Sequence, residues 1–152
     1  MSRAEHIASL YRDLLRDCAA SPDAHGLIDE PTHAAEGDNP LCGDHLRVEL
    51  RLDGTRIADI GFAGDCCVVA RASAALMCRL LRNGECARHG ELAQALRQVL
   101  RGGEAGAAGD VLGPLHSLRE VPERHKCALL PWAAAEAALL GEHEATTEPI
   151  SD

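Results

Sequence analysis

An alternating apolar pattern around an Asp-Gly pair is the feature that most limits how this chain folds. Every second residue is aliphatic over the first half of the pattern, namely Leu46, Val48, Leu50 and Leu52. Asp53-Gly54 follows, and the second apolar run, RIADIGF, comes directly after it. Strand side chains point alternately to the two faces of a sheet, and Asp-Gly is a preferred turn between two strands. The segment is therefore predicted to be an antiparallel hairpin with one apolar face.

Helical patterns flank the hairpin on both sides. Apolar residues recur at a spacing of three to four from Ala4 to about Ala20, which is typical of an amphipathic helix. Helices are also predicted in VVARASAALMCRLLRNG, in ELAQALRQVLRGG, in VLGPLHSLREVP from about Pro114, and in CALLPWAAAEAALLGEH. Proline fits best in the first turn of a helix, so Pro131 indicates that the last helix begins near Cys127. This order indicates an α+β fold, with helices packed on one face of a small antiparallel sheet.

The remaining segments are polar or rich in glycine and proline. Residues 28–44 are predicted to be a loop, and EAGAAGD is predicted to be a flexible linker. The sequence EATTEPISD closes the chain, and residues 143–152 are expected to be a disordered polar tail. The chain is accordingly predicted to be one domain over residues 1–142.

The charge of the chain excludes several classes of partner. Its 24 acidic and 15 basic residues give a formal net charge of −9, which disfavours nucleic acids and anionic membrane surfaces. No apolar run approaches the ~20 residues that a membrane span needs. The first residues, MSRAEHIASLYRDLLRD, are charged throughout and do not resemble a secretory signal. We expect a cytoplasmic protein.

Seven cysteines are the most reactive side chains in the sequence. An odd number of cysteines without an export signal disfavours a disulfide framework and favours metal ligands, nucleophiles or buried apolar residues. Cys18 and Cys78 fall inside predicted helices, where core or inert roles are expected. Cys86 follows the Asn-Gly stop of a helix and is expected to be an incidental loop thiol.

Two other cysteines are expected to meet at one end of the hairpin, where an aspartate and a third cysteine could complete a site. Cys42 comes just before the first strand and Cys67 just after the second, so strand pairing can bring them together. Gly43 lets the backbone bend so that Cys42 and Asp44 face one centre. Cys67 and Cys127 each precede a predicted helix, whose N-terminus stabilises a thiolate. Three thiolates and a carboxylate suit a tetrahedral zinc or iron site.

Each of these features also has an ordinary structural explanation. Gly and Asp are common turn residues, so the Cys-Gly-Asp segment is compatible with a simple turn. Cys127 is compatible with a buried residue at the start of a helix, preceded by a solvated charged run at residues 124–126. His45 is expected at the surface, and Asp65 is expected to be a turn residue. Local spacing alone leaves the metal site and the turn equally open.

Three longer segments resemble one known family. NPLCGDHLRVEL, GFAGDCCVVARASAALM and ERHKCALLPWAAAEAAL resemble, in order and spacing, the cysteine segments of the SufU/IscU (NifU N-terminal) iron–sulfur assembly proteins. The likeness extends to LYRDLLRDCAASPDAHGLI and covers nearly the whole chain apart from the tail. Residues 102–123 resemble an extra stretch of SufU-type members, and Arg124 and Lys126 are similar to the residues that SufU-type members carry.

The resemblance implies a function and a set of site residues. The implied metal ligands are Cys42, Asp44, Cys67 and Cys127, which hold zinc in SufU-type members and a nascent [2Fe–2S] cluster in IscU-type members. The chain would accept sulfur from a cysteine desulfurase of SufS type that uses pyridoxal phosphate, and would pass it to downstream assembly proteins or apoproteins. Cys42 would be the sulfur acceptor, and Arg124 would stabilise its thiolate or orient the ligands. Such a protein is a sulfurtransferase-like accessory rather than a complete enzyme.

Three alternatives accompany this interpretation. The first is a scaffold that assembles a [2Fe–2S] cluster on the same four residues. The second is a structural zinc domain that serves only in protein contacts. The third is a thiol redox protein that uses Cys66 and Cys67, although neighbouring cysteines form only strained disulfides. Cys66 stands where the family usually has glycine, and neighbouring side chains of an extended chain point to opposite sides, so only Cys67 is expected to bind metal and Cys66 is a competitor.

Overall fold

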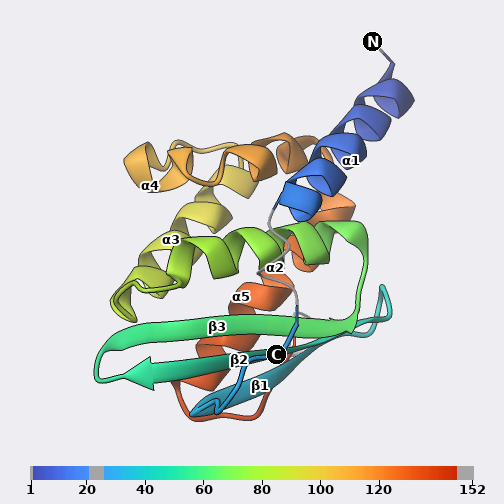
Figure 1. Cartoon of the computed structure of the whole chain (residues 1–152). Coiled ribbons are helices and arrows are strands. Elements are labelled where there is room, and N and C mark those ends of the chain that lie inside the picture. Colours follow the sequence, from blue (N-terminus) through green and yellow to red (C-terminus); the bar gives the residue numbers. More distant parts are fainter. Residues whose placement is uncertain (1, 21–25, 147–152) are drawn as a thin grey trace, which may run out of the picture.

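The computed structural model describes residues 2–20 and 26–146, which form one sheet covered on one face by helices (Figure 1). The elements in chain order are α1 (Arg3–Ala20), β1 (His33–Asn39), β2 (Asp44–Asp53), β3 (Arg56–Asp65), α2 (Val68–Leu81), α3 (Ala87–Leu100), α4 (Gly106–Asp110), the 3₁₀ helices η2 (Gly113–Glu120) and η3 (Pro122–Arg124), α5 (His125–Leu139) and β4 (Glu144–Thr146). The α+β prediction is confirmed.

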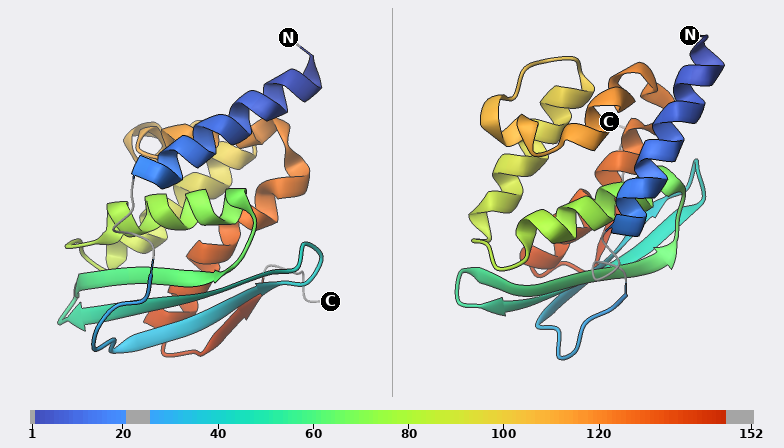
Figure 2. Two further views of the ribbon diagram at one scale, coloured as in Figure 1. Left: turned by 45° about the vertical axis from the view of Figure 1, so that its right-hand side comes forward. Right: turned by 45° about the horizontal axis from the view of Figure 1, so that its top comes forward.

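The predicted hairpin is confirmed as β2 and β3. The two strands pair antiparallel from His45 opposite Asp65 to Asp53 opposite Arg56, and Gly54 takes a left-handed φ of 65° in the turn. The apolar side chains of Leu46, Val48 and Leu50 are fully buried. Helices α2 and α5 lie on this face, and α1 packs on the far side of α2 (Figure 2). The alternation in the sequence therefore marks the face that builds the core.

The sheet has two strands that the sequence did not predict. Its order is β3-β2-β1-β4, with β1 antiparallel to β2 and β4 parallel to β1. The prediction of a loop over residues 28–44 is wrong for β1, which consists of HAAEGDN. A Cβ atom at Gly37 would lie 3.1 Å from Ala134 Cβ and from Leu130 Cδ1. Helix α5 packs so closely on β1 that the strand needs small residues, which lack the usual bulky strand pattern.

Other boundaries also differ from the predictions. The disordered tail predicted from residue 143 is wrong for residues 144–146, which form β4, and the tail's last six residues lie outside the described part. The predicted flexible linker contains the short helix α4, and η2 is a 3₁₀ helix. Cys78 is fully buried as expected, whereas the side chain of Cys18 lies outside the described residues. Within the described part, no helix has the length and apolarity that a membrane crossing needs.

Helix α5 is fastened to its neighbours around an internal proline. The sequence analysis placed Pro131 in the first turn of the last helix. The helix begins at His125, however, so Pro131 lies in its second turn. Proline has no N–H to donate to the carbonyl four residues earlier, that of Cys127. Three bonds join this region to α2 and α3. They are Ser73 Oγ to Ala128 O (2.6 Å), Trp132 Nε1 to Ser73 Oγ (3.0 Å) and His89 Nε2 to Trp132 O (2.9 Å).

Candidate metal centre

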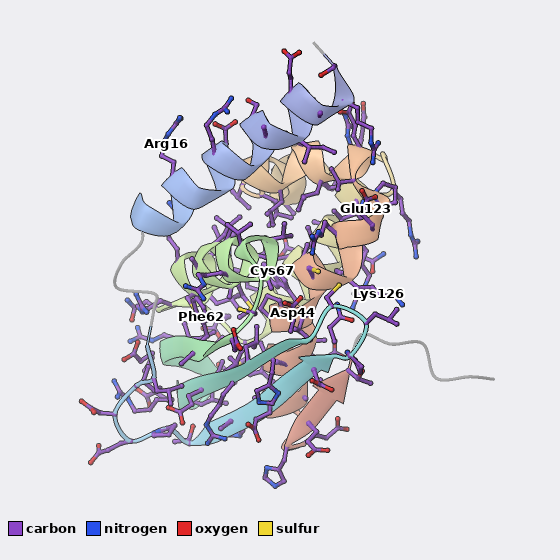
Figure 3. The ribbon with its side chains drawn as sticks, turned by 90° about the vertical axis from the view of Figure 1, so that its right-hand side faces the viewer. Arg16, Asp44, Phe62, Cys67, Glu123 and Lys126 are labelled. Carbon is purple, nitrogen blue, oxygen red and sulfur yellow. The ribbon has the colours of Figure 1, made fainter. Side chains whose placement is uncertain are left out.

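The predicted ligand residues come from three separate parts of the fold. Cys42 lies in the turn between β1 and β2, and Asp44 is the first residue of β2. Cys67 is the N-cap of α2, two residues after the end of β3, and Cys127 lies in the first turn of α5. Figure 3 shows Asp44 and Cys67 at the boundary between the sheet and the helices. The hairpin register explains how Asp44 and Cys67 meet, because β2 begins beside the residues where β3 ends, and the docking of α5 adds Cys127.

The structure brings these residues into contact. The sulfur atoms of Cys42 and Cys127 are 3.6 Å apart, and one carboxylate oxygen of Asp44 lies within 4.8 Å of both sulfurs. The backbone N–H of Cys67 donates to Asp44 Oδ1 at 2.7 Å, and the side chain of Cys67 interacts with that of Cys127, which lowers the pKa of Cys67. Cys67 thus joins the tight group of Cys42, Asp44 and Cys127 through its contacts with Cys127 and Asp44.

Two glycines shape the backbone around this group. Gly43 has a left-handed φ of 72°, which lets the turn place Cys42 and Asp44 toward the same centre, as predicted. At Gly64 a Cβ atom would lie 2.3 Å from the carbonyl oxygen of His45. Glycine at this position therefore allows β3 to approach β2 closely just before the Cys66-Cys67 pair.

The donor atoms fit a metal ion. Asp44 is 2% exposed, and its Oδ2 is buried without a hydrogen-bond partner. A buried carboxylate oxygen without a donor is costly, and a cation in contact with it offsets that cost. Sulfur atoms are the other donors, and three sulfurs with one oxygen supply four ligand atoms of the kinds that zinc binds in tetrahedral sites. Cys42, Asp44, Cys67 and Cys127 would hold the ion.

The thiols differ in acidity even without a metal. The hydrogen bond from Cys127 is the main cause that lowers the pKa of Cys67 to about 6, and the N–H groups of Ala70 and Val69 at the start of α2 add to the effect. Donation to Cys67 and burial raise the pKa of Cys127. Burial also raises the pKa of Cys66 to about 11. Among Cys66, Cys67 and Cys127, the thiolate of the metal-free protein is therefore on Cys67.

This difference predicts selective alkylation of the neighbouring cysteines. In chelator-treated protein at pH 7.5, we expect iodoacetamide to modify Cys67 well before Cys66, because the thiolate is the nucleophile. Labelling of Cys67 should fall as the pH is lowered through about 6, where its thiolate is protonated. Tandem mass spectrometry of the peptide that contains both residues measures the two rates. The urea-unfolded protein, in which the rates should converge, is the control, and equal rates in the folded protein would contradict the prediction.

The other residues considered from the sequence lie around this centre. Arg124 ends η3, three residues before Cys127, and is half-buried. Its role in stabilising a thiolate or orienting the ligands stays a prediction. His45 is exposed as expected, on the outer face of the sheet, where its Nε2 lies 3.1 Å from Glu36 Oε1. Asn39 was missed by the sequence analysis, although it opens the motif Asn-Pro-x-Cys-Gly-Asp. It is fully buried beside the cluster, and its Nδ2 lies 3.9 Å from Cys127 Sγ.

Sequence comparison finds known proteins that match this chain over most of its length. The chain is 29% identical over 145 residues to the zinc-dependent sulfurtransferase SufU of Bacillus subtilis, a match that covers 93% of this chain and 97% of the relative. It is also 29% identical over 155 residues to the iron–sulfur cluster assembly scaffold protein IscU of Streptococcus pyogenes, covering 100% of this chain and 93% of the relative.

Solved structures agree with these sequence matches. A putative iron–sulfur cluster assembly scaffold protein for the SUF system of Fervidobacterium islandicum superposes with a TM-score of 0.76 at 29% identity, over 86% of this chain and 97% of that chain. A NifU-like N-terminal protein of Brucella abortus shares the fold, with a TM-score of 0.78 at 19% identity over 90% of this chain and 96% of that chain. The family model for the NifU-like N-terminal domain matches residues 10–144, so the chain belongs to this family.

Proposed function

We propose that this protein is a zinc-dependent sulfur acceptor that serves a cysteine desulfurase in iron–sulfur cluster assembly. One observation carries the proposal: a single cysteine of the cluster is exposed, while its partners are buried or half-buried. Cys42 is exposed in the turn between β1 and β2, beside Leu41, which is 75% exposed. Asp44 and Cys127 are buried behind it, and Cys67 is half-buried. The cluster thus has one thiol that a partner protein can reach.

The chemistry follows from this arrangement. Bound Zn²⁺ would keep the ligand cysteines as thiolates at neutral pH. The partner is a pyridoxal-phosphate enzyme of SufS type, whose active-site cysteine carries a persulfide. The Cys42 thiolate attacks the outer sulfur of that persulfide, so a new S–S bond forms on Cys42 as the partner's S–S bond breaks. The partner's cysteine leaves as a thiolate, and no external oxidant or reductant is needed.

Arg124 is proposed to assist this transfer from the start of α5. It lies three residues before Cys127 in the helical segment that also presents Lys126. A guanidinium keeps its charge at every physiological pH, which suits it to stabilise a thiolate or to orient the ligands. The sulfur on Cys42 would then pass to downstream assembly proteins or apoproteins.

Loss of the exposed thiol tests the proposal. We expect Cys42→Ser to accept no persulfide sulfur from a SufS-type desulfurase supplied with cysteine, and to lose stimulation of the desulfurase's turnover. Persulfide-specific labelling with mass spectrometry, together with sulfide release, measures both effects. Cys86→Ser is the matched control, because Cys86 is a half-buried thiol at the N-cap of α3, outside the cluster. Full sulfur acceptance by Cys42→Ser would exclude the proposed role.

A second candidate is a scaffold on which a [2Fe–2S] cluster is built. The match to IscU of Streptococcus pyogenes over 100% of this chain favours it, because that relative is named a scaffold. The same thiolates suit iron–sulfur ligation. Elemental analysis separates the two functions: zinc without acid-labile sulfide supports the relay, whereas iron with matching sulfide supports the scaffold. The analysis should be repeated on protein prepared without oxygen, since air strips clusters.

A further inference from the structure

Asn39 makes contact with three of the four candidate ligand residues. It is the last residue of β1, and its backbone carbonyl accepts a hydrogen bond from the Cys42 N–H at 3.2 Å. In the strand register it stands opposite Asp44. Its side-chain Nδ2 donates to Cys127 Sγ at 3.9 Å, across 88 residues of sequence. Asn39 therefore joins the turn of Cys42, the start of β2 and the first turn of α5.

The side chain of Asn39 is only half satisfied. The residue is 0% exposed, and its Oδ1 is buried without a hydrogen-bond partner. A buried acceptor that lacks a donor is unfavourable, and an apolar side chain of similar size would avoid the cost. The amide at this position is thus explained by its donor, which faces Cys127, and not by packing or by its acceptor.

The three less exposed ligands each receive at least one N–H donor. Asp44 accepts from the backbone of Cys67 at 2.7 Å, Cys67 Sγ from the backbone of Ala70 at 3.5 Å, and Cys127 Sγ from the side chain of Asn39. Such donors offset part of the negative charge that three thiolates and a carboxylate bring to one ion. Residues that hydrogen-bond to metal ligands tune both the affinity and the orientation of those ligands. Two of these donors are backbone groups, so Asn39 is the side chain among them.

We infer that Asn39 is a positioning residue of the metal centre, which donates to the Cys127 thiolate and holds it toward Cys42 and Asp44. This inference rests on the metal centre of the proposed function, but not on sulfur transfer itself. The hydrogen bond is stronger when Cys127 is a thiolate than when it is a thiol. Asn39 should therefore favour the metal-bound protein over the metal-free protein.

Two substitutions test this inference with Zn²⁺ and Co²⁺ as probes. Asn39→Leu keeps the branching of the side chain in a larger volume, and it removes both the donor and the unsatisfied acceptor. Asn39→Asp keeps the shape but places a carboxylate against the thiolate. We expect Zn²⁺ affinity, measured by competition with a chromogenic chelator, to fall by about 10–100-fold for Asn39→Leu and further for Asn39→Asp. The sulfur-to-cobalt charge-transfer absorption of the Co²⁺ form should shift to lower energy, because the thiolate loses its donor.

The unfolding of the metal-free variants separates this role from a purely structural one. For Asn39→Leu, the urea midpoint of metal-free protein should stay close to that of the wild type, because the loss of an unsatisfied buried group offsets the cost of fitting a larger side chain. Unchanged Zn²⁺ affinity and unchanged Co²⁺ absorption in a folded Asn39→Leu or Asn39→Asp protein would overturn the inference. Wild-type protein that binds Zn²⁺ but accepts no sulfur would overturn only the proposed relay. The role of Asn39 would still be decided by the ratio of the Zn²⁺ affinities of the wild type and the Asn39 variants.

Discussion

Replacing Cys127 by serine is expected to lower the affinity for Zn²⁺ by roughly 100-fold or more. Structural zinc sites bind with about 10–16 kcal/mol, so one of four ligands accounts for roughly 3 kcal/mol, which is about a factor of 100. Cys127 donates to Cys42 Sγ at 3.6 Å and also interacts with Cys67, so its loss affects the whole cluster. A serine hydroxyl is a poor substitute for a thiolate and would itself be buried.

Chelator competition on the purified variant measures this effect. Cys86→Ser provides the control, because Cys86 lies at the start of α3, outside the cluster. Its backbone N–H donates to the carbonyl of Thr55 in the hairpin turn, a bond that serine retains. The unfolding of metal-free Cys127→Ser should remain cooperative, which shows that ligand loss and not misfolding lowers the affinity. Equal Zn²⁺ affinities in the two variants would show that Cys127 is no ligand.

The largest effect on stability is expected for Trp132→Ala, which should lower the free energy of unfolding by about 3–5 kcal/mol. Trp132 is 1% exposed and has the largest volume among the fully buried side chains of the described residues. Its removal leaves a cavity between α5, α2 and α3, and breaks the bond from Nε1 to Ser73 Oγ. Domains of this kind are stable by about 5–15 kcal/mol, so the variant should lose a large part of its stability.

Urea unfolding followed by circular dichroism measures this loss, because Trp132 is the chain's one tryptophan and fluorescence disappears with it. Trp132→Phe is the matched variant, since it keeps one aromatic ring but removes the rest of the indole together with the donor to Ser73. It should cost about 1–3 kcal/mol, less than the alanine variant, because the hydrogen bond is lost but the cavity is smaller. An alanine variant as stable as the phenylalanine variant would show that the core closes around the missing ring.

The hairpin was predictable because the apolar alternation that forms its buried face lies within the segment itself. The buried face of β2 is built by Leu46, Val48 and Leu50, and their alternation is visible without any partner. Strand β1 was not predictable for the opposite reason. Its buried positions are Ala35, Gly37 and Asn39, which are small or polar because α5 packs closely on this strand and because the cluster needs an amide. The sequence shows that the side chains of β1 are small, but it does not show that helix α5 packs against them.

The candidate site was predictable to the extent that the hairpin was. Cys42 and Cys67 flank its two strands, so pairing alone brings them to one edge. The position of Cys127 followed from the family resemblance, since only the docking of α5 brings it to that edge. The donor role of Asn39 depends on the same docking. No spacing in the sequence indicates that a side chain at the end of β1 meets a sulfur 88 residues later.

The wide separation of the cluster's residues along the chain has a consequence for the order of folding. Contact between Cys42 and Cys127 closes a loop of 85 residues. Such distant contacts form late in folding, because the chain loses the entropy of closing the loop before the contacts stabilise it. A chain in which only the hairpin has formed offers an ion Cys42, Asp44 and Cys67 but not Cys127, so it holds the ion more weakly. Metal captured early therefore exchanges freely, and tight retention begins only when α5 reaches the sheet. Slow metal release thus reports that the last helix has docked.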